Sequence, residues 1–145
     1  MITKTENIVN GYFYAFTYKA RSTEQDVDPF PLIYCIRPGE KDLNNFIGLN
    51  LHHLPVKLRE ELIKGMQKTK NFLNEPRTIF SETELNTLVP GCRAAVREYS
   101  RKRVFNPYRI DSKDTPYYIY GNMLHKSDSL SRSLTDFILK VTKKV

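Results

Sequence analysis

The spacing of apolar residues changes within residues 45–73, and this change constrains the fold more than any other feature of the chain. In NFIGLNLHHL (45–54) the apolar residues nearly alternate, as they do in a strand with one buried face. From Pro55 onward they recur at helical spacing, at Leu58, Leu62 and Met66, and proline suits the first turn of a helix. The sequence therefore predicts a strand that passes directly into an amphipathic helix.

His52 and His53 lie side by side at the end of this predicted strand. Adjacent residues of a strand point to opposite faces, so the two imidazoles are poorly placed to bind one metal ion. The other soft metal ligands, Cys35, Cys92 and His125, have no zinc-site spacing. We expect one histidine to be buried and the other exposed, and we expect no metal and no cofactor.

The rest of the chain shows strand patterns and helix patterns in separate groups. Aromatic and β-branched residues predict further strands at 11–20, 31–39, 104–110 and 116–124. Helices are predicted from residue 55 to near Pro76, and at 81–89, 92–103 and 129–144. The helix at 81–89 begins with the capping-box residues Ser81 and Glu84. This segregation of strands and helices indicates an α+β fold.

We expect these elements to form a single domain over residues 1–145. About five strands, from 11–54 and 104–124, are predicted to form a small SH3-like β-barrel. A helical insertion at 55–103 interrupts the strands, and a C-terminal helix at 129–144 follows them.

Basic residues are concentrated in the middle of the chain. The net charge is +7, and residues 55–113 alone hold 13 basic and 7 acidic side chains. Arginines on one face of the predicted helix 92–103 can contact successive phosphates, and the interleaved Tyr99 and Tyr108 can stack on unpaired bases. The predicted nucleic-acid or partner-binding residues are Arg93, Arg97, Arg101, Lys102, Arg103 and Arg109, with Lys57, Lys64 and Lys68 as a second row. A solvated helix face, or an acidic protein neighbour, explains the same pattern.

The sequence shows no convincing active site. The glycines are scattered and form no phosphate-binding loop, and Asp26 and Asp28 lack the partner carboxylates of a metal-dependent nuclease. The two cysteines are far apart and are expected to be free, buried thiols, with Cys92 the better candidate for a reactive thiol. No secretory signal or membrane span is predicted. We therefore expect a protein that is not an enzyme, with a nuclease or a thiol enzyme as the alternative.

Several short segments share their order and spacing with one group of known proteins. The segments are YKA (18–20), DPFPLIYCI (28–36), FIGLNLHHLPVKLREEL (46–62) and AAVREYSRKRV (94–104), followed by YRI (108–110). Together they resemble small proteins of tailed phages, in particular T-even-like phages and cyanophages with contractile tails. Members of this group are virion proteins or proteins without an assigned role, and some are associated with the protein that caps the ends of packaged phage DNA.

This resemblance implies a structural or assembly protein of the virion, located in the neck, tail or baseplate and assembled in the host cytoplasm. Its partners would be other phage proteins and packaged double-stranded DNA. The two histidines would then end a barrel strand, and Arg59 would anchor the helix after Pro55 or contact a partner. A phage effector that binds nucleic acid or a host protein is the alternative.

Overall fold

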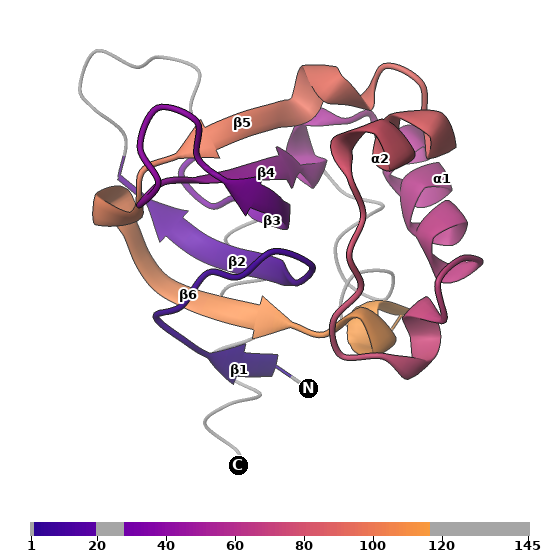
Figure 1. Cartoon of the computed structure of the whole chain (residues 1–145), viewed down its shortest axis with the longest axis horizontal. Coiled ribbons are helices and arrows are strands. Elements are labelled where there is room, and N and C mark those ends of the chain that lie inside the picture. Colours follow the sequence, from indigo (N-terminus) through magenta and orange to yellow (C-terminus); the bar gives the residue numbers. More distant parts are fainter. Residues whose placement is uncertain (1, 20–27, 117–145) are drawn as a thin grey trace.

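The computed structural model describes residues 2–19 and 28–116, and these residues form an α+β fold, as predicted (Figure 1). The strands are β1 (Ile2–Lys4), β2 (Phe13–Tyr18), β3 (Leu32–Pro38), β4 (Phe46–Asn50), β5 (Val96–Tyr99) and β6 (Val104–Ile110). The helices are α1 (Val56–Gln67) and α2 (Glu82–Leu88). The predicted strand 116–124, beyond its first residue, and the predicted helix 129–144 lie outside the described residues.

The six strands form one antiparallel sheet in the order β1-β6-β2-β3-β4-β5. The sheet is not closed into a barrel, so the predicted SH3-like barrel is wrong. Closure would require β5 to pair with the far edge of the sheet. Instead, the chain leaves β5 through a short turn and re-enters the sheet as β6, between β1 and β2. The two edge strands, β1 and β5, are short, which limits pairing with other chains.

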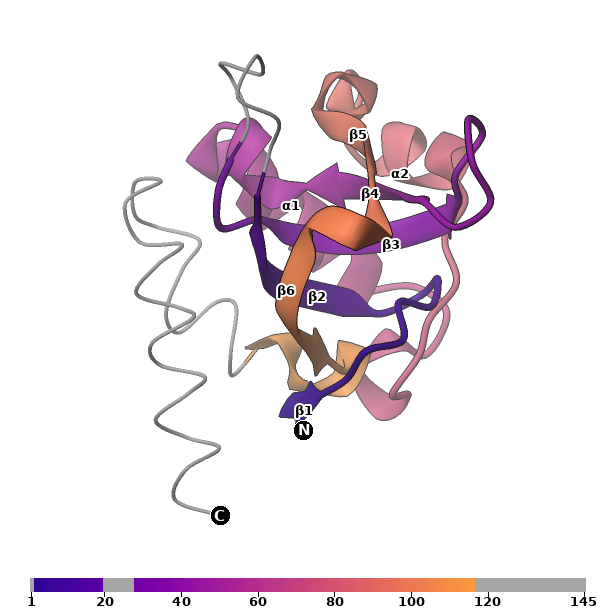
Figure 2. The ribbon, with the colours of Figure 1, turned by 90° about the vertical axis from the view of Figure 1, so that its left-hand side faces the viewer.

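Each face of the sheet contributes to a hydrophobic cluster. Alternation along β2 sends Phe13 and Ala15 into a core shared with α1 and α2, whereas Tyr14 and Phe16 enter a second, mainly aromatic cluster. In that cluster the rings of Phe16, Phe46 and Tyr99 lie with centroids 5.5–5.9 Å apart. Figure 2 shows the β5–β6 turn at the near end of the sheet and the helices at the far end. The molecule thus has a helical end and a turn end.

The predicted passage from strand to helix is confirmed. Strand β4 ends at Asn50, a 3₁₀ turn (Leu51–His53) follows, and α1 begins directly after Pro55, which is its N-cap residue. The helix ends at Gln67, well before Pro76. The predicted capping box of α2 is also present, because Ser81 Oγ accepts from the Glu84 N–H and the Glu84 carboxylate accepts from the Ser81 N–H.

The predicted helix 92–103 is wrong. The insertion 55–103 is therefore not purely helical, because it includes a strand. Residues Cys92–Ala95 form a 3₁₀ turn, Val96–Tyr99 form β5, and Arg101–Arg103 form a second 3₁₀ turn, η4. Strand β5 pairs with β4, and Val96 lies opposite Leu49. Pairing with a distant strand therefore overrides the helix preference of the local sequence. Strand β1, which the sequence analysis missed, pairs with β6.

Candidate nucleic-acid interface

The predicted basic residues do not line one helix face, because the segment that carries them is a strand between two 3₁₀ turns. Arg93 lies near α2, where its Nε is 3.3 Å from Glu82 Oε2. Arg97 turns back onto its own backbone and donates to the carbonyl of Ala94 at 2.6 Å. Arg109 lies on β6, with its guanidinium 4.6 Å from the centroid of the Tyr12 ring. These three arginines are separated from one another and are engaged in local contacts.

The predicted second row is formed, but it is remote from the arginines of the β5–β6 turn. Lys57, Lys64 and Lys68 are exposed on the outer side of α1 and just beyond its end. Helix α1 lies at the helical end of the molecule and the turn between β5 and β6 at the opposite end (Figure 1). The two predicted rows therefore form separate surfaces.

Arg101, Lys102 and Arg103 lie together in η4, which is fastened to the end of β2. The Ser100 N–H donates to Tyr18 Oη at 3.1 Å, and the Lys19 N–H donates to the Arg103 carbonyl at 2.9 Å. The Arg103 guanidinium donates in return to the Lys19 carbonyl at 3.1 Å. These bonds bring Lys19 beside residues that follow it by more than eighty positions.

The side chains of this turn and of Lys19 surround an open hollow of about 350 Å³. The residues that line it are Lys19, Ser100, Lys102, Arg103 and Phe105. We call this group of five residues the basic turn. The Lys19 Nζ lies 4.5 Å from the centroid of the Phe105 ring, a cation–π contact. Among the residues that the structure describes, no carboxylate lines this hollow. The basic turn therefore brings the exposed Lys19 and Lys102, the half-buried Arg103 and an exposed aromatic ring around one hollow.

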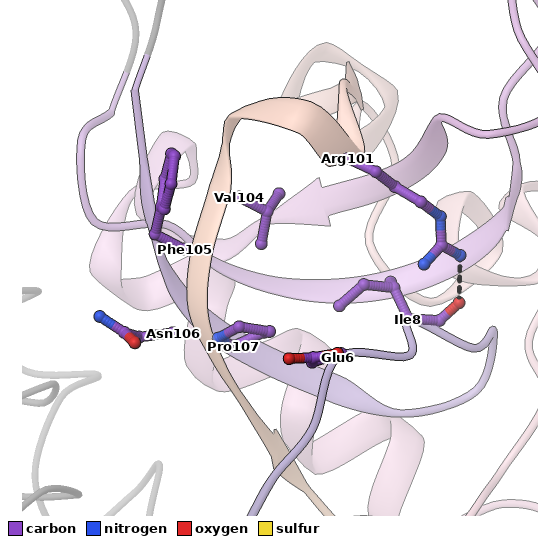
Figure 3. A pocket seen from close by; sticks show the side chains of 7 residues that line it. All are labelled: Glu6, Ile8, Arg101, Val104, Phe105, Asn106 and Pro107. Carbon is purple, nitrogen blue, oxygen red and sulfur yellow. Dashed lines mark hydrogen bonds between the residues drawn. The ribbon is translucent and has the colours of Figure 1, made fainter.

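Arg101 has a different role from its neighbours in η4. Its guanidinium donates to the Ile8 carbonyl at 2.7 Å, as Figure 3 shows, and lies 5.8 Å from the centroid of the Phe46 ring. It thereby joins the turn to the segment between β1 and β2 and to the aromatic cluster. We therefore assign Arg101 a structural role. Among the predicted arginines, only Arg103 belongs to the basic turn.

Lys19 and Phe105 are the members of this surface that the sequence analysis missed. Both belong to segments with strand patterns, in which nothing local distinguishes an exposed aromatic ring from a buried one. The pairing of β2 with β6 places Thr17 opposite Phe105 and Tyr18 opposite Val104. Because Lys19 directly follows Tyr18, this pairing brings the side chains of Lys19 and Phe105 together. Only the sheet register reveals the contact.

A second polar site lies buried beneath the strand-to-helix passage. His52 Nδ1 is 2.7 Å from Asp28 Oδ2, and the Asn50 amide donates to Asp28 Oδ2 at 3.3 Å and to Tyr99 Oη at 3.1 Å. Burial alone would raise the pKa of Asp28, but the hydrogen bonds from His52, the Phe30 N–H and Asn50 lower it below its usual value. The carboxylate is therefore ionised at neutral pH and accepts these hydrogen bonds.

This cluster confirms that one histidine is buried and the other exposed. His52 is buried, whereas His53 is exposed. Arg59, which is buried on α1, donates to the carbonyls of Leu54 at 2.7 Å and His52 at 2.8 Å. The expected anchoring of the helix by Arg59 is thus confirmed, and the two histidines belong to the hinge between β4 and α1.

The two cysteines are free and buried, as predicted. Burial raises the pKa of the Cys35 thiol to about 12 and also raises the pKa of Cys92. Both thiols are therefore protonated at neutral pH, which does not favour the reactive Cys92 considered above. Within residues 2–19 and 28–116, no group of three or more His, Cys, Asp or Glu residues could hold a metal ion.

The described helices are also too short or too polar to cross a membrane.

Comparisons of the chain with models of protein families, with curated proteins and with solved structures find no match. The resemblance to tailed-phage proteins therefore stays a prediction from the sequence segments.

Proposed function

We propose that this chain acts by binding rather than by catalysis, and that its basic turn binds the phosphate backbone of nucleic acid. The observation that carries the proposal is the convergence of Lys19, Lys102 and Arg103 on one hollow without a carboxylate among its described lining. Cations grouped in this way attract phosphates and release the counterions condensed around them. The net charge of +7 supports the same partner, because it adds a long-range attraction for polyanions.

The state of the other reactive side chains supports a binding role. The buried His52 and the largely buried Asp28 belong to a cluster that fixes the hinge between β4 and α1, and the Cys35 thiol lies within the aromatic cluster. These groups hold the fold together and are turned away from solvent. The nuclease and thiol-enzyme alternatives therefore have less support than a binding protein.

A protein partner is the second candidate, and one observation favours it. Leu43, at the tip of the β3–β4 turn, exposes 83% of its surface, and it lines a hollow of about 170 Å³ together with the exposed Val9. Exposed apolar side chains of this kind are common where proteins bind one another. An assembly role in a virion, which the resemblance to phage proteins suggests, would use such a contact.

The basic turn is tested by replacing Lys102 and Arg103 together with Ala. We expect the affinity for a fluorescently labelled oligonucleotide to fall about ten- to a hundredfold at about 50 mM salt, because two phosphate contacts are lost. The measurement is fluorescence anisotropy of the labelled strand titrated with protein. The matched control replaces Lys64 and Lys68 with Ala, which removes the same charge from the helical end.

The control variant should bind almost as tightly as the unmodified chain. An equal loss in both variants would contradict the proposal, because it would show that only the total charge matters. If the unmodified chain binds no nucleic acid at low salt, the proposal is wrong and the protein partner becomes the leading candidate.

A further inference from the structure

Phe105 is an aromatic residue that the fold leaves in solvent. It exposes 41% of its surface, whereas Phe13, Phe16, Phe46, Phe72 and Phe80 expose 2% or less. Residue 105 lies at the start of β6, at the turn end of the molecule, which α1 and α2 do not cover (Figure 2). A single exposed ring is ordinary, so its surroundings decide whether it has a function.

Two hollows meet at this ring. One is the hollow of the basic turn, in which Lys19, Lys102 and Arg103 face solvent. The other, of about 330 Å³, also has Phe105 in its lining and is shown in Figure 3. Its wall includes apolar atoms of Ile8, Val104 and Pro107. Phe105 thus stands between a hollow lined by three cations and one whose described lining pairs a single cation with a carboxylate.

A bulge in β6 fixes the ring in this position. The register with β2 moves from Thr17 opposite Phe105 to Ala15 opposite Tyr108, so β6 has one more residue than β2 in this interval. Asn106 accommodates the extra residue with a left-handed backbone, φ 53°. Because of this bulge Tyr108 enters the core beside the helices, whereas Val104 packs against the aromatic cluster. The exposed ring is therefore held on a rigid strand rather than on a loop.

The charges on the two sides of the ring differ in a way that orients a ligand. The basic turn attracts phosphates. The hollow of Figure 3 includes the exposed carboxylate of Glu6 at its rim, which repels phosphates. The one cation in its described lining, Arg101, is bound to the Ile8 carbonyl. An uncharged, flat group therefore suits this hollow, and a phosphodiester suits the other.

We propose, on the basis of the proposed function, that this site binds single-stranded nucleic acid, with an unpaired base stacked on Phe105 and the adjoining phosphates on Lys19, Lys102 and Arg103. Stacking on an aromatic ring is available only to a base that has left its own stack, as in a single strand. Every base has a flat π-face, so the contact is tolerant of sequence. Duplex DNA can reach the cations but offers no free base to the ring.

The test compares Phe105→Leu with the unmodified full-length chain, using a labelled oligothymidylate of about 12 nucleotides and a duplex of the same length. Leucine keeps an apolar side chain but removes the ring. We expect the unmodified chain to bind the single strand more tightly than the duplex. The substitution should weaken single-strand binding about tenfold or more, while duplex binding changes by less than about twofold.

A second variant, Phe105→Trp, provides an optical readout that is independent of affinity. The chain has no tryptophan, so the introduced indole is the sole tryptophan signal. We expect its fluorescence to be quenched by oligothymidylate and to be nearly unchanged by the duplex.

The outcomes separate this inference from the proposed function. Equal single-strand binding by Phe105→Leu and the unmodified chain, with no quenching in Phe105→Trp, would overturn the stacking site while leaving the phosphate contacts intact. Equal affinity for single strand and duplex would overturn it as well. Absence of binding to either nucleic acid would overturn the proposed function itself.

Discussion

Asp28 shows how a single, largely buried carboxylate organises the hinge between β4 and α1. Its two oxygens accept hydrogen bonds from the Phe30 N–H at 2.9 Å, from His52 at 2.7 Å and from the Asn50 amide at 3.3 Å. The Asn50 side chain in turn accepts a hydrogen bond from the backbone N–H of His52 and donates one to the hydroxyl of Tyr99 in β5. One carboxylate therefore links β4, the 3₁₀ turn after it and the edge strand β5.

Replacing Asp28 with Asn should destabilise the fold, and the loss should depend on pH. At neutral pH we expect the free energy of unfolding to fall by about 1–3 kcal/mol, because buried donors lose a charged acceptor. The pKa of Asp28 is lower in the folded chain than its unfolded value of about 3.9. Its ionisation therefore adds stability above about pH 4, and this contribution is lost as the pH falls through the folded-state pKa.

Urea denaturation of both chains at about pH 7 and about pH 3 measures this difference. The gap between the unmodified chain and Asp28→Asn should narrow in acid. Asp42→Asn is the matched control, because Asp42 is exposed and its carboxylate accepts from the N–H of Asn44 within its own turn. A gap of the same size at both pH values, or an equal loss in the control, would show that the buried carboxylate is not the cause.

At the scale of elements, β5 is where local sequence and tertiary structure disagree most. Its residues follow two alanines, and Arg97 lies at helical spacing from Arg93 and Arg101 on either side of the strand, yet β5 pairs with β4 as an edge strand. Val96 is half-buried, packs against the core shared with the helices and lies opposite Leu49. The strand is therefore stabilised by contacts that lie far away in sequence.

Val96→Ala distinguishes a strand from a helix at this position. In β5 the change removes buried methyl groups and β-propensity, so we expect a loss of about 1–2 kcal/mol in the free energy of unfolding. In a helix, alanine would compensate for part of that loss. Val56→Ala, the same change in the first turn of α1, is the matched control and should cost less. If Val96→Ala is neutral or stabilising in urea denaturation, β5 is not a strand.

The sequence predicted the elements whose pattern is local and missed those that depend on distant partners. Strands β2, β3, β4 and β6 are marked locally by aromatic and β-branched residues, helix α1 by its apolar period, and α2 by its capping box. Strand β5 depends on β4, and the open sheet depends on where the η4 turn leads the chain. Neither is encoded in a short segment.

The candidate site follows the same rule. Lys102 and Arg103 were predicted because they are adjacent in a basic run, and both belong to the basic turn. Lys19 and Phe105 were not predicted, because they meet only through the pairing of β2 with β6. Arg101 is an arginine in the same basic run as Arg103. Its hydrogen bond to the Ile8 carbonyl nevertheless gives it a structural role that the sequence does not show.

At the scale of the whole molecule, the two ends of the sheet differ in composition. The helical end contains α1 and α2 packed on a large apolar core, and its surface lysines lie on the outer side of α1. The turn end contains the basic turn, where three cations and an exposed ring surround adjoining hollows. A polyanion is therefore expected to approach the turn end, although exposed lysines also lie at the helical end.

The most direct test of this account is the salt dependence of single-strand binding, measured by anisotropy over a range of salt concentrations. Each phosphate contact in a single strand contributes about −0.7 to the slope of log K against log salt, so three cations predict a slope near −2. Removing Lys102 and Arg103 should bring the slope to about −0.7, and removing Lys64 and Lys68 should leave it unchanged. A slope that changes only when the lysines of α1 are removed would place the contacts at the wrong end of the molecule and contradict the account.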